Sequence, residues 1–272
     1  MSRALSDPIG IVVCGAAGRM GRLLVALAGE SGLRVAGAIE ATGHPALDRD
    51  AGEVAGAGAC GVRLTDDAAA VVRAEHVVLS FTMPQATVEH VRLAAERGAG
   101  VVVGTTGLDA GQDRDMRAAA ARTRSVIAAN YSVGVTVLTE LVASASRLLD
   151  ASFETEIVEL HHHAKRDAPS GTALALGRAA AAGRGRELAQ VEVSAREGLV
   201  GARRPDEIGI FGLRGGDAVG DHTVFFCGLG ERLELTHRAQ SRECLVRGAL
   251  RAARWVATQP AGIYAMRDVL GL

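Results

Sequence analysis

A chain of 272 residues with 48% hydrophobic residues can bury one large core or two moderate ones. Its formal net charge of −1 argues against a dedicated nucleic-acid binder, which needs a strong basic field. No run of about 18 apolar residues occurs, and segment 1–10 is too polar for a signal peptide. The four cysteines are scattered without a CxxC pair, which is typical of a reducing compartment. We therefore expect a cytoplasmic protein with no membrane and no nucleic-acid partner.

The first half of the chain alternates short apolar runs with helical patterns. The strand-like runs are residues 9–14, 33–40, 76–81, 100–104 and 125–130, and the helical patterns are 19–29, 84–97 and 109–122. Pro84 suits a first helical turn and Gly98 suits a helix end. Short strands separated by helices of this length indicate βαβ units. The pattern predicts an α/β domain over residues 1–132, with a Rossmann-type doubly wound parallel sheet.

The pattern changes after residue 132. We expect a helix at 133–150, a strand at 154–163, a short helix at 170–182, long loops through 198–220, and a final helix at 241–257 before a short tail. Two β-rich runs, 223–227 and 232–237, predict an antiparallel hairpin through 228–231. This order predicts a second, smaller α+β domain over 133–240. The last segment, 241–272, is expected to return to the first domain.

A glycine-rich turn follows the first expected strand. It reads Gly15-Ala16-Ala17-Gly18-Arg19-Met20-Gly21 and runs into a helix. Glycine allows a tight turn and a close backbone approach, while a helix N-terminus offers N–H groups to a pyrophosphate. Glu40 follows Gly21 by 19 residues, where an acidic side chain would bond a ribose 2′-hydroxyl. The spacing predicts a dinucleotide site, although a purely structural strand–helix turn is the alternative.

The same acidic residue bears on the choice of cofactor. A carboxylate at Glu40 accepts a hydrogen bond from a hydroxyl but repels a 2′-phosphate. Ala41 and Thr42 follow it, so no basic residue stands beside it to hold that phosphate. NADH is therefore favoured, while Arg19 in the glycine turn leaves NADPH open.

A dense group of titratable residues closes the expected strand 154–163. His161, His162 and His163 are contiguous, and strand alternation would place His161 and His163 on one face. Lys165 is the only lysine among 30 basic residues. A partly desolvated lysine can give up a proton at useful pH and arginine cannot. A histidine and a lysine together indicate proton transfer near neutral pH.

A helix start follows this group. Ser170 is a natural N-cap, so Gly171 and Thr172 would present backbone N–H groups to a carboxylate. Three other interpretations of this segment compete with proton transfer and carboxylate binding. A zinc site needs ligands that converge, whereas neighbouring histidines on a strand diverge. Ser170 as a nucleophile lacks a G-x-S-x-G elbow. A solvated loop without function is the third.

Two further turns lie at the ends of expected parallel strands. Gly104, Thr105 and Thr106 follow one strand. The next strand ends in Ala128, Ala129, Asn130 and Tyr131. Ligands bind at these strand ends in open α/β sheets, so both turns are candidate contacts for the nicotinamide. Simple turn chemistry is the alternative.

Segment 159–174 resembles the signature of the 4-hydroxy-tetrahydrodipicolinate reductase family, also called dihydrodipicolinate reductase. Its core reads E-x-H-H-x-x-K-x-D-A-P-S-G-T-A. The resemblance extends over nearly the whole chain through the G-x-x-G-R-M-G turn and segments 104–107, 129–132, 231–237 and 266–270. It implies reduction of 4-hydroxy-tetrahydrodipicolinate by NAD(P)H with loss of water, in bacterial diaminopimelate and lysine synthesis. It also implies a homotetramer assembled through the second domain's sheet.

The resemblance also assigns roles to residues. His161 would donate and accept the proton, Lys165 would donate a proton, His162 would contact substrate, and Ser170, Gly171 and Thr172 would hold its carboxylate. The cofactor would contact Gly15, Ala16, Ala17, Gly18, Arg19, Met20, Glu40, Gly104, Thr105, Thr106, Ala128, Ala129, Asn130 and Tyr131. No metal is implied.

Two positions depart from the family pattern. Ala41 stands where many relatives carry a basic residue, and Ser80 stands where relatives often carry aspartate. Two other hypotheses compete with the reductase. One is a dinucleotide-sensing regulator, although no helix-turn-helix is evident. The other is a dehydrogenase acting on an acyclic imine. In the favoured hypothesis a cyclic dicarboxylate lies against the nicotinamide across a cleft between the two domains.

Overall fold

The computed structural model describes residues 8–272 and divides the chain into two compact units. Unit 1 contains the described residues up to Val133 together with Glu243–Leu272, and unit 2 is Gly134–Arg242. The expectation that segment 1–10 is not a signal peptide concerns residues most of which lie outside the described part of the chain. Within residues 8–272, the helices are too short or too polar to cross a membrane.

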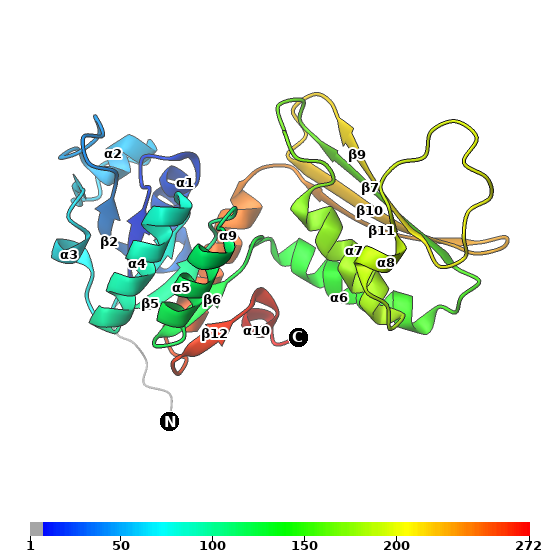
Figure 1. The fold of residues 1–272 in the computed structure, drawn as a ribbon. Helices are drawn as coiled ribbons and strands as arrows, with labels where there is room; N and C mark the ends of the chain where they lie inside the picture. The colour runs from blue at the N-terminus through cyan, green and yellow to red at the C-terminus, as the bar shows by residue number, and fades with distance from the viewer. Residues whose placement is uncertain (1–7) are drawn as a thin grey trace. The chain divides into compact units, whose positions relative to one another are not determined.

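Unit 1 is built on a parallel sheet of seven strands (Figure 1). Its order is β12-β6-β5-β4-β1-β2-β3. The strands are β1 Ile9–Cys14, β2 Leu33–Ile39, β3 Leu64–Thr65, β4 Val77–Ser80, β5 Gly100–Val103, β6 Arg124–Ile127 and β12 Gly262–Tyr264. The five strands expected from apolar runs are confirmed. Strand order runs outward in both directions from β1, so the switch point lies between β1 and β4, where open sheets bind ligands.

Helices cover both faces of this sheet. Alternation along β1 sends Ile11 and Val13 into one core and Val12 and Cys14 into the other. The first core holds α1 Arg19–Leu27 and α9 Glu243–Val256, and the second holds α4 Pro84–Arg97 and α5 Ala110–Ala120. The remaining short helices of the unit are η1 Gly29–Ser31, α2 Ala51–Ala55, α3 Ala68–Val71 and α10 Met266–Leu270. Buried strands with helices on both faces make the sheet doubly wound, as predicted.

The C-terminal segment does more than the expected short tail. Helix α9 buries Val246, Leu250 and Val256 in the core of unit 1. After it, β12 pairs in parallel with β6 and α10 adds Met266 to the same core. The expectation of a tail was wrong because the strand is too short to show a periodic pattern.

Unit 2 is a five-stranded mixed sheet with helices on one face (Figure 1). The strand order is β11-β10-β7-β9-β8. The strands are β7 Glu154–His161, β8 Glu192–Val193, β9 Ile208–Arg214, β10 Gly220–Cys227 and β11 Arg232–Ala239, and the helices are α6 Val133–Leu148, α7 Gly171–Gly183 and α8 Leu188–Val191. Ile157, Ile210 and Phe226 pack against Val142 and Leu176 of the helices. The predicted hairpin is confirmed as β10 and β11, which pair antiparallel.

Strand β9 contradicts the expectation of loops through 198–220. It pairs in parallel with β7, which makes the sheet mixed. Two glycines in this segment suggested a loop, but both leave room for glutamate side chains of β7. A Cβ on Gly209 would lie 1.9 Å from Glu156 Oε2, and a Cβ on Gly212 would lie 2.7 Å from Glu159 Oε1. The glycines that suggest loops are therefore a packing requirement of the sheet.

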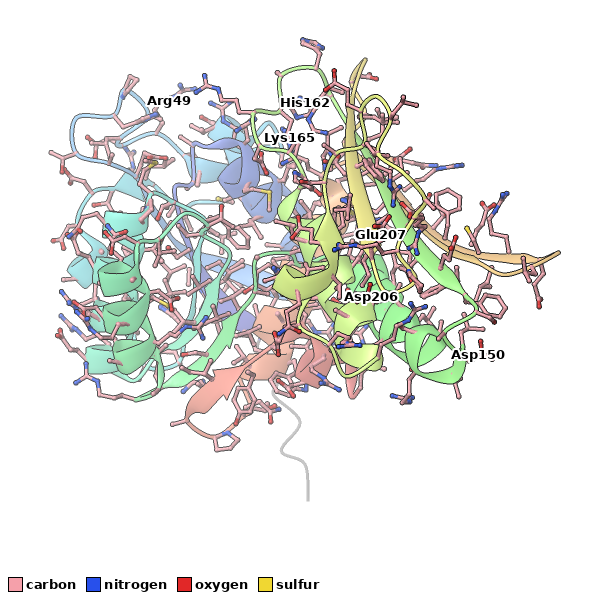
Figure 2. The ribbon with its side chains drawn as sticks, turned by 45° about the vertical axis from the view of Figure 1, so that its right-hand side comes forward. Arg49, Asp150, His162, Lys165, Asp206 and Glu207 are labelled. Atoms are coloured by element: carbon pink, nitrogen blue, oxygen red, sulfur yellow. The ribbon has the colours of Figure 1, made fainter. Side chains whose placement is uncertain are left out.

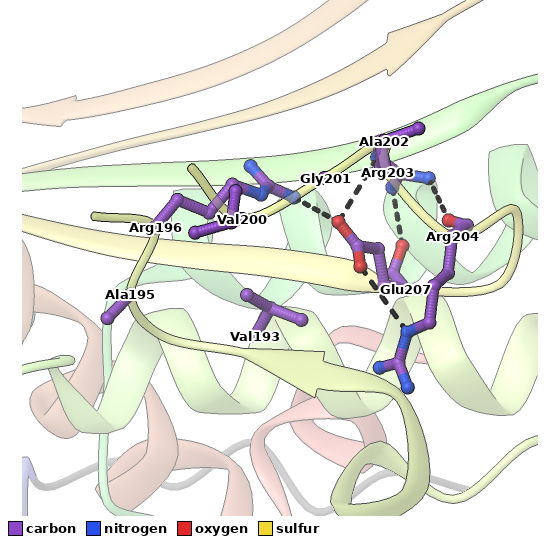
Figure 3. Close-up of a pocket in the computed structure, with 9 residues that line it drawn as sticks. All are labelled: Val193, Ala195, Arg196, Val200, Gly201, Ala202, Arg203, Arg204 and Glu207. Atoms are coloured by element: carbon purple, nitrogen blue, oxygen red, sulfur yellow. Dashed lines mark hydrogen bonds and ion pairs between the residues drawn. The ribbon is translucent and has the colours of Figure 1, made fainter. Parts of the chain in front are cut away.

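Residues 194–207, called the arm here, form a wide loop between β8 and β9 (Figure 1). Figure 3 shows the guanidinium groups of Arg196 and Arg204 both directed at the carboxylate of Glu207. Arg196 Nη2 lies 2.6 Å from Glu207 Oε1, and Arg203 Nε lies 2.9 Å from Glu156 Oε1. Residues of the arm, together with Val193, line an open pocket of about 440 Å³. The Arg196–Glu207 ion pair lies within the arm, and the Arg203–Glu156 ion pair ties the arm to strand β7.

Candidate active site

The glycine turn is a tight backbone cradle at the carboxyl end of β1. Gly15 has φ 70°, and its N–H donates to Ile39 O at 2.9 Å. A Cβ on Gly21 would lie 2.0 Å from Gly15 O, so the turn and α1 pack backbone to backbone. Because Gly18 is the N-cap, the first N–H groups of α1 receive no side-chain cap. This arrangement fits a pyrophosphate.

Glu40 stands directly after β2 and reaches the glycine turn. Its Oε2 accepts from Ala17 N at 2.9 Å, and its Oε1 accepts from Ala41 N at 3.0 Å. The two hydrogen bonds hold a carboxylate beside the turn, as a ribose-binding acid requires. Arg19 and Gly18 are exposed on the same turn, while Ala16 and Ala17 are buried. The residues present therefore fit a nicotinamide dinucleotide.

The turns after β4 and β5 are joined by a chain of hydroxyl groups. Ser80 Oγ lies 3.1 Å from Thr87 Oγ1 and 3.3 Å from His90 Nδ1. Thr87 Oγ1 lies 2.6 Å from Thr105 Oγ1, which also accepts from Thr82 N at 3.1 Å. Burial lowers the pKa of His90, which keeps the ring neutral at this serine. Ser80 therefore belongs to a neutral network that fixes the turn holding Gly104, Thr105 and Thr106.

The turn after β6 is anchored by a buried tyrosine. Tyr131 is 1% exposed, and its hydroxyl donates to Val103 O at 2.8 Å and lies 3.0 Å from Val126 O. Burial raises the pKa of this hydroxyl far above its usual value. Asn130 Oδ1 accepts from Ser132 N at 2.8 Å. With Ala128 and Ala129, the turn offers its backbone at the sheet edge, while the tyrosine side chain holds the strands together.

In unit 2, the histidine run straddles the end of β7. The strand ends at His161, which is 9% exposed. The expectation that His161 and His163 share a strand face was wrong, because the chain turns after His161. His163 is exposed, and its Nδ1 lies 3.0 Å from Gly216 O. The turn separates one buried histidine from its two neighbours.

Glu159 lies at the centre of the polar cluster around His161. Its side chain has no exposed area. Oε2 lies 2.5 Å from His161 Nδ1 and accepts from Arg214 Nη1 at 2.8 Å. Oε1 accepts from Ser170 N and from Arg214 Nη2, both at 3.0 Å. Burial alone would raise the pKa of Glu159, but the hydrogen bonds from Arg214 and His161 outweigh it and hold that pKa below its usual value. The carboxylate is therefore ionised and fully paired.

Lys165 lies in the turn that follows this cluster, close to His162 (Figure 2). Its Nζ donates to both carboxylate oxygens of Asp167, at 2.8 and 2.9 Å. That hydrogen bond from the lysine holds the pKa of Asp167 below its usual value. The pKa of His162 is lowered, first by burial and then by the positive charge of Arg242. A lysine 20% exposed and a partly buried, neutral histidine therefore share one turn.

The N-terminus of α7 completes the cluster. Ser170 is the N-cap, as predicted, and its Oγ accepts from Ala173 N at 3.1 Å. The same Oγ lies 2.9 Å from His222 Nε2, and the His222 ring meets the His161 ring edge-on at 5.1 Å. Gly171 is exposed and Thr172 is partly exposed at the first turn. A capped helix start with neighbouring cations suits a carboxylate ligand.

His222 gives a prediction about stability and pH. Burial, followed by the charge of His161, lowers the pKa of His222 from 6.5 to about 4. The unfolded chain therefore binds this proton more readily than the folded protein. Stability that is present above pH 6.5 should be lost as the pH falls toward 4, by on the order of 3 kcal/mol.

The check is urea unfolding of wild type and His222→Gln between pH 7 and pH 4.5. The difference in unfolding free energy between the two proteins should shrink as the pH falls. The exposed His163→Gln is the control, and its difference from wild type should stay constant. If the unfolding free energies of wild type and His222→Gln changed equally with pH, a buried neutral His222 would be contradicted.

Three members of this cluster have no role that was predicted from the sequence. Glu159 could have been found, because it shares a strand face with His161 two residues later. Arg214 and His222 could not, because they come from β9 and β10, and only the sheet brings them beside β7. Among residues 8–272, no group of three or more His, Cys, Asp or Glu side chains is placed to hold a metal ion.

Comparisons with known proteins agree across both units. The family model described as dihydrodipicolinate reductase, N-terminus, matches residues 9–131, and the C-terminus model matches 134–270. A 4-hydroxy-tetrahydrodipicolinate reductase of Anaeromyxobacter sp. (strain Fw109-5) is 50% identical over 265 residues, covering 97% of this chain and 98% of the relative. One of Halorhodospira halophila is 49% identical, covering 97% and 99%.

Solved structures show the same fold. A dipicolinate-bound dihydrodipicolinate reductase from Paenisporosarcina sp. TG-14 superimposes with a TM-score of 0.72 at 20% identity, covering 96% of this chain and 98% of that one. An amine dehydrogenase from Mycobacterium smegmatis gives 0.61 at 15% identity, covering 97% and 96%. The predicted fold class and the resemblance read from segment 159–174 are confirmed. The chain belongs to the dihydrodipicolinate reductase family.

Proposed function

We propose that the protein is a cytoplasmic reductase that converts 4-hydroxy-tetrahydrodipicolinate to tetrahydrodipicolinate with loss of water, in diaminopimelate and lysine synthesis. Relatives of this name align with the chain at about 50% identity from end to end. The observation that carries the proposal is in unit 2. The buried His161 ends β7, Lys165 lies in the turn that follows, and Ser170 caps the helix α7 that begins after this turn.

Each group has a role in holding the substrate or moving a proton. Gly171 and Thr172 at the start of α7 bind a carboxylate, and His162 contacts the substrate beside it. A reduced nicotinamide held by unit 1 would supply the hydride. Lys165 supplies a proton, and His161 accepts and returns a proton at Nε2, as water leaves and negative charge develops on the ring. Lysine is suited to this because its ammonium can release a proton, unlike the 29 arginines.

Unit 1 would hold the cofactor, with NADH favoured over NADPH. The pyrophosphate would meet the turn from Gly15 to Met20, and the adenosine ribose would meet Glu40. The carboxylate of Glu40 is fixed by Ala17 N and would repel a 2′-phosphate. The nicotinamide amide would contact the backbone of the turns holding Gly104, Thr105 and Thr106, and Ala128 to Tyr131.

The decisive experiment is an absorbance assay with freshly made 4-hydroxy-tetrahydrodipicolinate and either NADH or NADPH. Oxidation of the cofactor is expected, with the higher kcat/KM for NADH. Turnover only with an acyclic imine would favour the dehydrogenase hypothesis. Calorimetric binding of the cofactor without turnover of any imine would favour the regulator. Calorimetric titration of both cofactors separates the cofactor preference from catalysis.

A homotetramer through unit 2 is part of the proposal. The sheet face opposite α6 and α7 carries Val158, Leu160, Phe211, Leu213 and Phe225, all at least partly exposed. Apolar sheet faces of this kind are typical of contacts between subunits. Sedimentation equilibrium should report a mass of about four times 28.0 kDa.

A further inference from the structure

Glu159 makes four hydrogen bonds and contacts three different elements of unit 2. It joins the His161 ring on its own strand, the Arg214 guanidinium on β9, and the backbone of Ser170 at the start of α7. Burying a charged carboxylate with no exposed area carries a desolvation penalty, and its hydrogen bonds do little more than offset that penalty. Fold stability alone therefore does not account for this side chain. We therefore ask which of its hydrogen-bond partners has a state that Glu159 determines.

The controlled group is the His161 ring. Arg214 and the Ser170 N–H can only donate, and an ionised carboxylate can only accept. Nδ1 of His161, 2.5 Å from Glu159 Oε2, must therefore carry a hydrogen. In the neutral ring this leaves Nε2 with the lone pair. Nε2 lies beside Gly220, where a Cβ would come within 2.9 Å of it, so a glycine at this position leaves room for the ring edge that carries Nε2.

We propose that Glu159 is the positioning residue of the reaction, fixing His161 as the Nδ1–H tautomer so that Nε2 exchanges the proton with substrate. The inference rests on the proposed function, in which His161 transfers that proton. Through Ser170 N the same carboxylate fixes the ring relative to the helix that binds the substrate's carboxylate. One side chain thus sets both the atom that reacts and its position relative to the ligand.

The Glu159→Gln variant should reverse the tautomer rather than only weaken a contact. If the NH2 group of the glutamine side chain took the place of Oε1, it would face Ser170 N and Arg214 Nη2, which can only donate hydrogen bonds. At the Oε2 position it faces Arg214 Nη1 and His161 Nδ1, of which the histidine can change tautomer. The NH2 group is therefore expected at the position that Oε2 occupies in wild type, where it donates a hydrogen bond to His161 Nδ1. The hydrogen of the neutral ring then moves to Nε2, which cannot accept a proton.

The test is nitrogen NMR of protein labelled with ¹⁵N-histidine, with His161→Gln used to assign the signals. Wild type should show hydrogen on Nδ1, and Glu159→Gln should show it on Nε2. In the assay above, kcat of Glu159→Gln should fall about 10³-fold while KM stays within about threefold. Glu159→Asp, which restores a carboxylate, should return the Nδ1–H tautomer and part of the turnover.

Glu156→Gln is the matched control, because Glu156 lies on the same strand and pairs with arginines instead of a histidine. It should change neither the His161 signals nor kcat. An Nε2–H tautomer in wild type, or wild-type kcat in a Glu159→Gln protein that still binds NADH, would overturn the inference. If wild type fails to turn over the substrate, the proposed function falls. The tautomer measurement still decides whether Glu159 sets the state of His161.

Discussion

Replacing Lys165 with arginine is expected to lower kcat about 10²- to 10³-fold while leaving KM nearly unchanged. Arginine keeps the positive charge and can still pair with Asp167, which accepts from Lys165 Nζ at 2.8 and 2.9 Å. It cannot release a proton at the pH of the assay. The substitution therefore separates the charge of this position from its ability to act as an acid.

The neighbouring Arg166 supplies the control for this experiment. It is exposed one residue further along the same turn, and Arg166→Lys should leave both kinetic constants unchanged. Steady-state kinetics of both variants, with saturating NADH, make the comparison. Wild-type kcat in Lys165→Arg would remove the lysine from the chemistry and leave it as a charge that holds substrate.

Gly21→Ala adds a single methyl group and is expected to weaken cofactor binding strongly. The new Cβ would lie 2.0 Å from Gly15 O and 2.6 Å from Ala16 Cα, both backbone atoms. The turn or α1 must therefore move, which costs roughly 1–3 kcal/mol or more. Because the pyrophosphate needs the close approach of both, the Kd for NADH should rise at least about 100-fold.

Calorimetric titration with NADH measures this loss, and thermal unfolding checks that the protein remains folded. Gly29→Ala is the matched control, since no atom lies within 4 Å of its added Cβ. That variant should bind NADH as wild type does. Equal affinities for NADH in wild type and Gly21→Ala would mean that the cofactor lies elsewhere in unit 1.

The sequence predicted the sheet of unit 1 well because its central strands are buried on both faces. β1, β4 and β5 are continuous apolar runs, and the helices between them carry clear end signals at Pro84 and Gly98. Such strands need no alternation to be recognised. The two-residue β3 and the three-residue β12 carry too few residues for any pattern.

Unit 2 was harder to predict because its glycines and polar residues serve packing across strands. Gly212 leaves space for Glu159, and Gly220 leaves space for His161. In a single sequence both look like turn residues. The local part of the candidate site, Lys165 with the Ser170 cap, was predictable from spacing. The part that depends on neighbouring strands, Arg214 and His222, was not, because strand pairing is a long-range property.

The return of α9 to the core of unit 1 has a consequence for the order of folding. Unit 2 is one uninterrupted segment, whereas unit 1 joins residues up to Val133 with residues after Arg242. A ribosome therefore completes unit 2 before it makes α9, which shares one face of the parallel sheet with α1. Until α9 emerges, α1 alone lies over this face, and the apolar side chains that pack against α9 stay partly uncovered in the nascent chain. The later half of synthesis is thus the interval in which this protein most needs protection by chaperones.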